Sequence, residues 1–332
     1  MADLALNLPS GGAGQFLAHV SDLSDTDRAI VLLLQEDGRR AYANIAREIG
    51  ITERTVRHRV RDLLDRGVIQ ITAVTNPVAL GYNAAALIGL TTDPAVPASD
   101  IALSLVDIEA VDYVVVAAGR YTLFAEVICR DMAALQDIIE KQIGPIDGIR
   151  AIESFPYLSL HYQLARFDAA RRKSPQEAGV RPRQLNETDR QIVRALSDDG
   201  RAPLQSIADT LGISETQVRN RVNEMTAAGV MNVIAIVNPI SFAYTTMAWV
   251  AVRVASSHKV IDVAGALSDL PHITYVTICT GRADIFAEVA CVSPDELRRV
   301  LDDDIRQLPG VGEIEVSIYQ ALHYKRLTPF RG

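Results

Sequence analysis

Apolar and polar positions follow a helical period in the first part of the chain. Over Asp25–Glu36 and over Tyr42–Ile49 the apolar side chains fall on one face, which predicts two short helices. Gly50 ends the second helix, because glycine readily adopts the positive φ with which a chain leaves a helix. Thr52 is the expected N-cap of a third helix, which ends at Gly67. Two short helices joined by a glycine turn, the second with a polar outer face, predict a helix-turn-helix.

Short apolar runs alternate with amphipathic stretches beyond the third helix. They predict, in order, a strand over Ala84–Leu90, a helix over Ser99–Leu105, strands over Tyr113–Ala117 and Leu123–Cys129, a helix over Met132–Ile143 and a strand over Ile149–Tyr157. The order βαββαβ is that of a ferredoxin-like sandwich, in which two helices cover one face of a sheet. The other face needs a partner to bury its apolar side chains.

The chain contains this whole pattern twice. Leu23–Tyr162 aligns with Leu185–Tyr324 without a gap, and 48 of the 140 aligned positions are identical. Repeats of this size are sets of domains, since a solenoid has shorter and more numerous repeats. The predicted fold class is α+β, with two tandem units that each join a winged-helix-like helix-turn-helix to a ferredoxin-like βαββαβ sandwich. The second sandwich is the obvious partner for the open face of the first.

Changes in composition predict where these domains begin and end. Residues 163–184 are rich in charge and contain Pro175 and Pro182, which indicates a linker, and the glycine-containing start indicates a mobile tail. The expected segments are a tail over 1–20, a first helix-turn-helix over 21–72, a first ferredoxin-like sandwich over 73–162, the linker over 163–184, a second helix-turn-helix over 185–234 and a second ferredoxin-like sandwich over 235–326.

Composition narrows the class of protein. The 332 residues carry a net charge of −8, which argues against a general nucleic-acid coat but allows one local basic face. Neither a bilayer-spanning apolar run nor a signal peptide is recognisable, and three sparse cysteines indicate reduced thiols, so we expect a cytoplasmic protein with no membrane partner. Because no cysteine or histidine spacing resembles a zinc site and no nucleophile–base pair stands out, we expect no metal, no cofactor and no catalytic residue.

The third helix of the first repeat presents a basic face opposite its apolar side chains. Arginine pairs bidentately with guanine in the major groove, and threonine hydroxyls reach phosphates or base edges. The predicted DNA-contacting residues of this helix are Thr52, Arg54, Thr55, Arg57, His58 and Arg61. The alternative is a solvated face or a protein-docking surface, but the recurrence of the motif in both repeats favours DNA.

The second copy offers amides where the first offers arginines. Its predicted DNA-contacting residues are Ser214, Thr216, Gln217, Arg219, Asn220 and Asn223, and the amide side chains among them suit adenine. Leu23–Gln70 has nine arginines against eight acidic residues, whereas Leu185–Asn232 has five against seven. We therefore expect the first copy to supply most of the DNA affinity and the second to refine or orient binding. The linker, with six basic and two acidic residues, either contacts phosphates or is simply solvated.

A glycine turn between the middle strands of the second sandwich is a candidate small-molecule site. Backbone amides beside Gly281, the Thr280 hydroxyl and the Asp284 carboxylate can bind the two charged ends of an amino acid, and Arg282 lies beside them. The alternative is a tight hairpin in which Gly281 supplies a positive φ and Asp284 caps the turn.

The first sandwich has a different version of this turn. Gly119 and Thr122 are its candidate effector-binding residues, but Ala118 stands where the second repeat has a threonine, and Thr122 stands where it has an aspartate. Two of the groups that would hold an amino acid are therefore missing, which makes the first turn the weaker candidate.

Both repeats resemble the Lrp/AsnC (feast/famine) family of bacterial and archaeal transcriptional regulators. The resemblance rests on the segments LSDTDRAIVLLLQEDGR, IAREIGITERTVRHRVRDLLDRGVI, TGRADIFAEV and LPGV, and it covers nearly the whole chain outside the tail and linker. It implies sequence-specific binding of double-stranded DNA, self-association through the ferredoxin-like domains, and an amino acid or similar effector bound between them. The family's TGxxD loop falls on Thr280, Gly281 and Asp284. Because two units are fused, one chain resembles a built-in dimer, from which ring-like assemblies can form.

Two other functions compete with a transcriptional regulator. Siroheme decarboxylases have a similar architecture, but they need histidine and arginine facing a tetrapyrrole, and the strands Val111–Gly119 and Ile273–Gly281 contain no histidine. A small-molecule sensor that has lost DNA binding is compatible with the weakly charged second copy, whereas Arg54, Arg57 and Arg61 argue against it.

Overall fold

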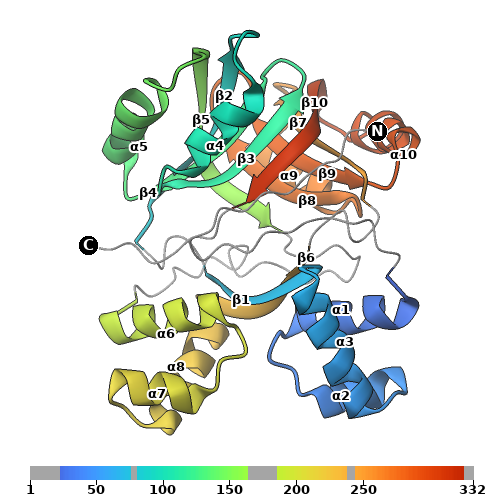
Figure 1. Cartoon of the computed structure of the whole chain (residues 1–332). Helices are drawn as coiled ribbons and strands as arrows, with labels where there is room; N and C mark the ends of the chain where they lie inside the picture. The colour runs from blue at the N-terminus through green and yellow to red at the C-terminus, as the bar shows by residue number, and fades with distance from the viewer. Residues whose placement is uncertain (1–22, 76–80, 164–184, 238–243, 325–332) are drawn as a thin grey trace. The chain divides into compact units, whose positions relative to one another are not determined.

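The computed structural model describes residues 23–75, 81–163, 185–237 and 244–324, which fall into two compact units (Figure 1). The helical unit contains residues 23–75, 81–82 and 185–237, and the barrel unit contains residues 83–163 and 244–324. Both repeats contribute to each unit, so the repeats share two folded bodies. The expected tail and all but the first residue of the expected linker lie outside the described residues.

The helical unit contains three helices from each repeat. They are α1 (Asp25–Glu36), α2 (Tyr42–Ile49) and α3 (Glu53–Asp65) from the first repeat, and α6 (Glu187–Asp198), α7 (Leu204–Leu211) and α8 (Glu215–Ala227) from the second. Gly50 ends α2 with a φ of 75°, and Gly212 ends α7 with a φ of 66°, as the turn between the two helices requires. The predicted helix-turn-helix is therefore present in both repeats.

A ribbon of two strands joins the two helix-turn-helix motifs. Strand β1 (Ile69–Thr75) pairs antiparallel with β6 (Met231–Val237), and Figure 1 shows this ribbon between the two groups of helices. Helix α1 packs against β6 of the other repeat, and α6 packs against β1. The strand that follows the third helix of each repeat, β1 or β6, thus has its hydrogen-bonded partner in the other repeat.

Two glycines allow each repeat to approach the ribbon closely. The Gly38 amide donates to the Val233 carbonyl at 2.8 Å, and the Gly200 amide donates to the Ile71 carbonyl at 3.0 Å. A Cβ on Gly200 would lie 2.8 Å from backbone atoms of Ile71 and Thr72. Strands β1 and β6 pair along their whole lengths, so the helical unit extends beyond the expected boundaries at 72/73 and 234/235.

The barrel unit is a closed antiparallel barrel of eight strands in the order β10-β3-β4-β2-β5-β8-β9-β7. Its elements in the first repeat are β2 (Ala84–Thr92), α4 (Ala98–Val106), β3 (Val111–Ala118), β4 (Leu123–Cys129), α5 (Met132–Ile138), a π-helical turn (Ile139–Ile143) and β5 (Ile149–Gln163). Those in the second repeat are β7 (Thr246–Val254), α9 (Val260–Ser268), β8 (Ile273–Cys279), β9 (Ile285–Cys291), α10 (Pro294–Arg299), a π-helical turn (Val300–Ile305) and β10 (Val311–Tyr324). Each repeat is the expected βαββαβ sandwich.

The two sandwiches close the barrel by pairing with each other. Strand β5 pairs with β8, where Tyr157 lies opposite Cys279, and β10 pairs with β3, where Tyr319 lies opposite Ala117. These pairings bury the face that the sequence left without a partner. They also account for the length of β5, which continues beyond the predicted end at Tyr157 to reach β8.

Apolar side chains form two outer cores and one inner core in the barrel unit. In the first repeat, Ile101 and Leu105 of α4 and Leu135 of α5 pack on one face of the strands, and the second repeat has the equivalent core. Aromatic rings fill the inner face, where Phe155 and Phe286 lie 4.9 Å apart.

The predicted helix over Met132–Ile143 is α-helical only to Ile138 and ends in a π-helical turn. No helix within the described ranges is long and apolar enough to cross a membrane.

Candidate nucleic-acid interface and effector turn

Helix α3 buries one face and exposes a basic one. Val56, Val60 and Leu63 are fully buried at helical spacing. The opposite side chains are exposed, namely those of Arg54, Arg57, His58 and Arg61. Arg57 forms an exposed ion pair with Glu53 at 2.7 Å, a contact that contributes little to stability and is readily exchanged for a phosphate. Within the described ranges, Arg54 and Arg61 form no ion pair.

Hydroxyl groups begin both third helices. The Thr52 side chain accepts a hydrogen bond from the Thr55 amide at 3.1 Å, and the two hydroxyls lie 2.8 Å apart. In the second repeat, Ser214 and Gln217 form a reciprocal capping box. These four predicted DNA-contacting residues therefore also fix the starts of α3 and α8.

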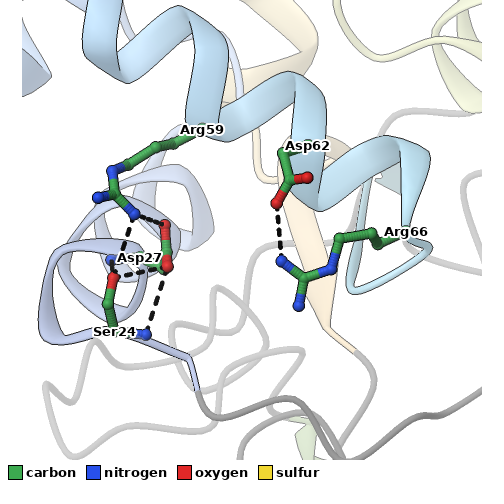
Figure 2. Close-up of polar contacts among 5 residues, drawn as sticks. All are labelled: Ser24, Asp27, Arg59, Asp62 and Arg66. Atoms are coloured by element: carbon green, nitrogen blue, oxygen red, sulfur yellow. Dashed lines mark hydrogen bonds and ion pairs between the residues drawn. The ribbon is translucent and has the colours of Figure 1, made fainter.

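An ion pair inside the first repeat holds α3 against α1. Arg59 donates to the Asp27 carboxylate at 3.0 Å and to the Ser24 hydroxyl at 3.3 Å, as Figure 2 shows. Burial acts to raise the pKa of Asp27, but hydrogen bonds from Ser24 and Arg59 outweigh it and hold that pKa below its usual value. The same view contains the exposed Asp62–Arg66 pair, which stays within α3.

The second repeat contains the same ion pair in a more buried form. Arg221 of α8 donates to Asp189 of α6 at 2.8 Å, and the Asp189 side chain is 0% exposed. Neither Arg59 nor Arg221 is among the residues for which the sequence predicts a role. The signal was present, because both arginines and both aspartates recur at equivalent positions of the repeats.

Helix α8 exposes a largely uncharged face. Thr216, Gln217, Asn220 and Asn223 are all exposed, whereas Arg219 forms an ion pair with Glu215 on the same helix. Repeat two therefore presents Thr216 and Asn223 where α3 presents Arg54 and Arg61, while Arg219 occupies the position of Arg57 and forms the same kind of exposed pair. This difference in charge is the one that the sequence predicted.

Reciprocal arginine contacts join the two helix-turn-helix motifs beside the ribbon. Arg39 donates to the Gly200 carbonyl at 2.7 Å, and Arg201 donates to the Gly38 carbonyl at 2.7 Å. The Arg201 guanidinium also lies 4.1 Å from the centre of the Tyr42 ring, and Arg57 lies 5.3 Å from it. The Tyr42 ring thus connects the junction between the repeats to Arg57 on α3.

The turn after β8 contains the effector candidates of the second repeat. Gly281 has a φ of 119°, and Asp284 accepts hydrogen bonds from the Val254 amide at 2.9 Å and from Arg253 at 3.4 Å. These contacts fit the hairpin alternative. They leave Thr280 exposed and the Asp284 carboxylate about one quarter exposed (27%).

The neighbouring Arg282 reaches across the repeats. Its side chain lies 3.5 Å from the Glu153 carboxylate of β5, so it points toward the first repeat. The Arg282 side chain is about half exposed and the Glu153 side chain about one third exposed, so the pair contributes little to stability.

The turn after β3 differs from the turn after β8 in what fills it. Tyr121 donates to Glu153 and lies against Gly89, where a Cβ would come within 2.7 Å of the ring. Gly281 is favoured by its positive φ of 119°, whereas Gly119 is required by space, because a Cβ there would lie 2.6 Å from the Ser317 hydroxyl. The Thr122 amide donates to the Leu90 carbonyl at 2.9 Å. In the second repeat, alanines stand in place of Tyr121 and Gly89.

One buried carboxylate, Glu126, and one half-buried carboxylate, Glu288, lie on the inner face of the barrel. Glu126 of β4 accepts hydrogen bonds from Tyr157 at 2.7 Å and from Tyr275 of the other repeat at 2.6 Å. Burial and the charge of Glu288 raise the pKa of Glu126, although the two tyrosine hydrogen bonds act to lower it. Glu126 is not among the residues for which the sequence predicts a role, although a glutamate stands in the middle of the same apolar strand in both repeats.

The second carboxylate repeats this arrangement. Glu288 of β9 accepts hydrogen bonds from Tyr319 at 2.7 Å and from Tyr113 of the first repeat at 2.5 Å. Each glutamate is therefore bonded by one tyrosine from each repeat. Burial, followed by the neighbouring carboxylates, raises the pKa of all four tyrosines well above its ordinary value, so they remain hydrogen-bond donors.

Comparisons with known proteins agree with this architecture. Models of the AsnC-type helix-turn-helix domain match residues 23–64 and 185–226, the Lrp/AsnC ligand-binding domain matches 85–165, and a C-terminal dimeric alpha+beta barrel domain matches 245–327. An uncharacterised HTH-type transcriptional regulator of Pyrococcus furiosus is 35% identical over 40% of this chain and 89% of its own length. The HTH-type transcriptional regulator LrpA of Pyrococcus horikoshii is 33% identical over 39% of this chain and 92% of its own.

The chain belongs to the Lrp/AsnC family of DNA-binding transcriptional regulators, in a form with two tandem units. A crystal structure of the siroheme decarboxylase NirDL covers 92% of the chain and 94% of its own with a TM-score of 0.63, at 14% sequence identity. That likeness concerns the fold alone. The described strands β3 and β8 contain no histidine, so the histidine and arginine set expected of a tetrapyrrole enzyme is not assembled there.

Proposed function

We propose that both reading helices of one chain contact a pseudo-palindromic operator, and that α3 supplies most of the affinity. The observation that carries this proposal is the exposed row of Arg54, Arg57 and Arg61 opposite a fully buried apolar face. Arginine contributes both phosphate attraction and bidentate recognition of guanine. Helix α8, with Asn220 and Asn223 exposed, refines which sequence is bound.

The ribbon and the arginine junction support a paired mode of binding. Because β1 pairs with β6 and Arg39 and Arg201 cross between the repeats, α3 and α8 are parts of one folded body. Two reading helices held in this way suit half-sites roughly one helical turn apart, ~34–36 Å.

Fluorescence anisotropy on a selected genomic fragment tests which helix dominates. Arg57→Ala is expected to weaken binding by about 1–3 kcal/mol and to lower the salt slope by about one, and Asn220→Ala is expected to weaken binding less. Arg66→Ala is the matched control, since Arg66 is an exposed arginine that pairs with Asp62 at the far end of α3. Equal losses for Arg57→Ala and Asn220→Ala would contradict the proposal.

For the small effector, we propose an amino acid bound at the turn of residues 280–284. Asp284 offers a carboxylate to the ammonium group, and Arg253, together with the Thr280 hydroxyl, offers donors to the carboxylate. Repeat two has an alanine where the Tyr121 ring fills the equivalent turn of repeat one, which supports placing the effector in repeat two. Gly119 and Thr122 are the weaker site.

Isothermal titration calorimetry with pooled amino acids, followed by single ones, tests this site. Asp284→Ala is expected to abolish the heat of binding, whereas Asp262→Ala, an exposed aspartate on α9, is expected to leave it unchanged. Undiminished binding to Asp284→Ala would remove the turn as the effector site.

The proposed role is regulatory and not catalytic, in the cytoplasm, with further self-association of chains through the barrel units. Regulators among the relatives and the absence of histidine from β3 and β8 support this proposal. Adding a tetrapyrrole is expected to leave its visible absorbance unchanged, and a shift would favour an enzyme. A strictly monomeric mass at micromolar concentration would exclude further assembly.

A further inference from the structure

Three side chains with metal-binding atoms meet at one end of the second sandwich. They are His272 in the loop before β8, Cys291 at the end of β9 and Glu296 on α10. One ligand atom from each lies within 4.8 Å of the others. Cys291 is 0% exposed, and the other two residues are half-buried. The set is therefore close to the surface but partly shielded from water.

The backbone around these residues fixes their positions. The His272 carbonyl accepts a hydrogen bond from the Ala290 amide at 2.9 Å, which places His272 beside the end of β9. Glu296 accepts a hydrogen bond from the Val292 amide at 2.6 Å through Oε2, and its own amide donates to Ser293. Since a carboxylate has about four lone-pair sites, this hydrogen bond leaves Glu296 able to bind a metal ion as well.

The first repeat provides an internal comparison. Residues Ala110, Cys129 and Ala134 occupy the positions of His272, Cys291 and Glu296. The first sandwich folds with alanine at two of the three, so the fold itself does not require the histidine or the glutamate. The histidine and the glutamate beside Cys291 are additions specific to the second repeat.

The geometry points to a binding site for one divalent transition-metal ion of the zinc class, held by His272, Cys291 and Glu296. Sulfur, nitrogen and oxygen ligands of this kind suit zinc, with bonds of about 2.0–2.3 Å. Tetrahedral bonds of that length bring ligand atoms within about 4 Å of one another, so small side-chain shifts close the set. The fourth position is left for water or an exogenous ligand.

The ligands are distant in sequence, which explains why their spacing gave no zinc motif. His272 precedes β8, Cys291 is the last residue of β9, and Glu296 lies on α10. A bound ion would tie the loop before β8 to the start of α10 and stabilise the barrel unit. Binding to the folded state alone raises stability as the metal concentration exceeds the dissociation constant.

Cobalt titration of the metal-free, tag-free full chain tests the site. One equivalent of Co²⁺ is expected to produce the near-ultraviolet band of a cobalt–thiolate bond, and Zn²⁺ is expected to displace it. Cys291→Ser should abolish the band, and His272→Ala and Glu296→Gln should each weaken binding roughly tenfold or more. Cys129→Ser is the matched control and should bind as the wild type does.

Two further measurements keep the outcome clear if Cys291→Ser fails to fold. Glu296→Gln keeps an oxygen for the Val292 amide, so circular dichroism should show it folded while its metal affinity falls. Zn²⁺ at a fixed concentration should raise the Tm of the wild type and of Cys129→Ser by similar amounts, and that of His272→Ala by less. No band at one equivalent of Co²⁺ in the wild type would overturn the proposal, as would a band that survives Cys291→Ser or unchanged affinity in both His272→Ala and Glu296→Gln.

Discussion

Arg59 of α3 donates to the Asp27 carboxylate of α1 at 3.0 Å, only two residues beyond the exposed Arg57. Arg221 and Asp189 repeat this contact in the second unit. Neighbouring arginines on one helix therefore have different partners, since Arg59 fixes the reading helix while Arg57 faces solvent. Loss of DNA binding after an arginine substitution consequently needs a stability measurement beside it.

The buried pair in the second repeat gives a sharp prediction about stability. Arg221→Met removes the guanidinium group that donates to the fully buried Asp189 carboxylate, and we expect the free energy of unfolding to fall by about 3 kcal/mol. Arg219→Met removes only an exposed pair and is expected to cost less than about 1 kcal/mol. Urea unfolding of both variants checks this difference. Similar small losses would show that the Arg221–Asp189 contact does not hold α8 in place.

Acid is expected to weaken the equivalent pair in the first repeat. The pKa of Asp27 is lowered in the folded state, so its contribution is fully present above the ordinary aspartate pKa of about 3.9 and is lost as pH falls through the lower, folded value. Asp27→Asn lacks this contribution at every pH. Unfolding free energies measured from neutral pH downward should converge for the two proteins, and a gap that widens toward low pH would contradict the assignment.

Glu126 in the barrel gives the opposite dependence of stability on pH. Burial raises its pKa, so the folded state binds the proton more tightly, and stability is lost as pH rises from the ordinary glutamate value of about 4.3 through the folded value. Glu126→Gln keeps an acceptor for Tyr157 and Tyr275 without the charge. We expect the stability of Glu126→Gln relative to the wild type to increase with pH across that range. A difference independent of pH would exclude a raised pKa.

The junction between the repeats should control paired binding. Gly200→Ala places a Cβ 2.8 Å from the backbone of Ile71 and Thr72, so we expect the ribbon contact to shift. Gly212→Ala introduces only backbone strain at a φ of 66°, with nothing within 4 Å of its Cβ. Gly200→Ala should weaken binding to a two-half-site operator more than to one half-site. Gly212→Ala should weaken binding to both about equally, and the same pattern from Gly200→Ala would contradict a rigid pair.

The local features of the fold could be predicted from the sequence, because short-range chemistry determines them. The apolar period and the Gly50 turn placed α1 and α2 at their observed bounds, and Thr52 and Ser214 are the N-caps expected. Contacts between the repeats could not be predicted in the same way. The pairing of β1 with β6, which moves the domain boundary, joins residues far apart in the chain and leaves no local pattern.

The site residues can also be divided into those that local spacing predicts and those that depend on contacts between distant segments. The exposed faces of α3 and α8 follow from helical spacing, and the structure exposes Arg54, Arg57, Asn220 and Asn223 as expected. Spacing does not show which charged side chains form ion pairs inside the protein. Arg59 is an example, because it pairs with Asp27 of another helix. Its partner Asp27 lies two helices earlier and becomes recognisable only when both repeats are compared.

Selection of genomic fragments by the purified chain, with and without a mixture of amino acids, tests whether the chain binds specific DNA sequences in response to a small effector. We predict enrichment of a pseudo-palindromic site with half-sites about one helical turn apart, enrichment that shifts with the mixture and is lost in Arg57→Ala protein that remains folded. No enrichment at low salt by folded wild-type protein would contradict the account.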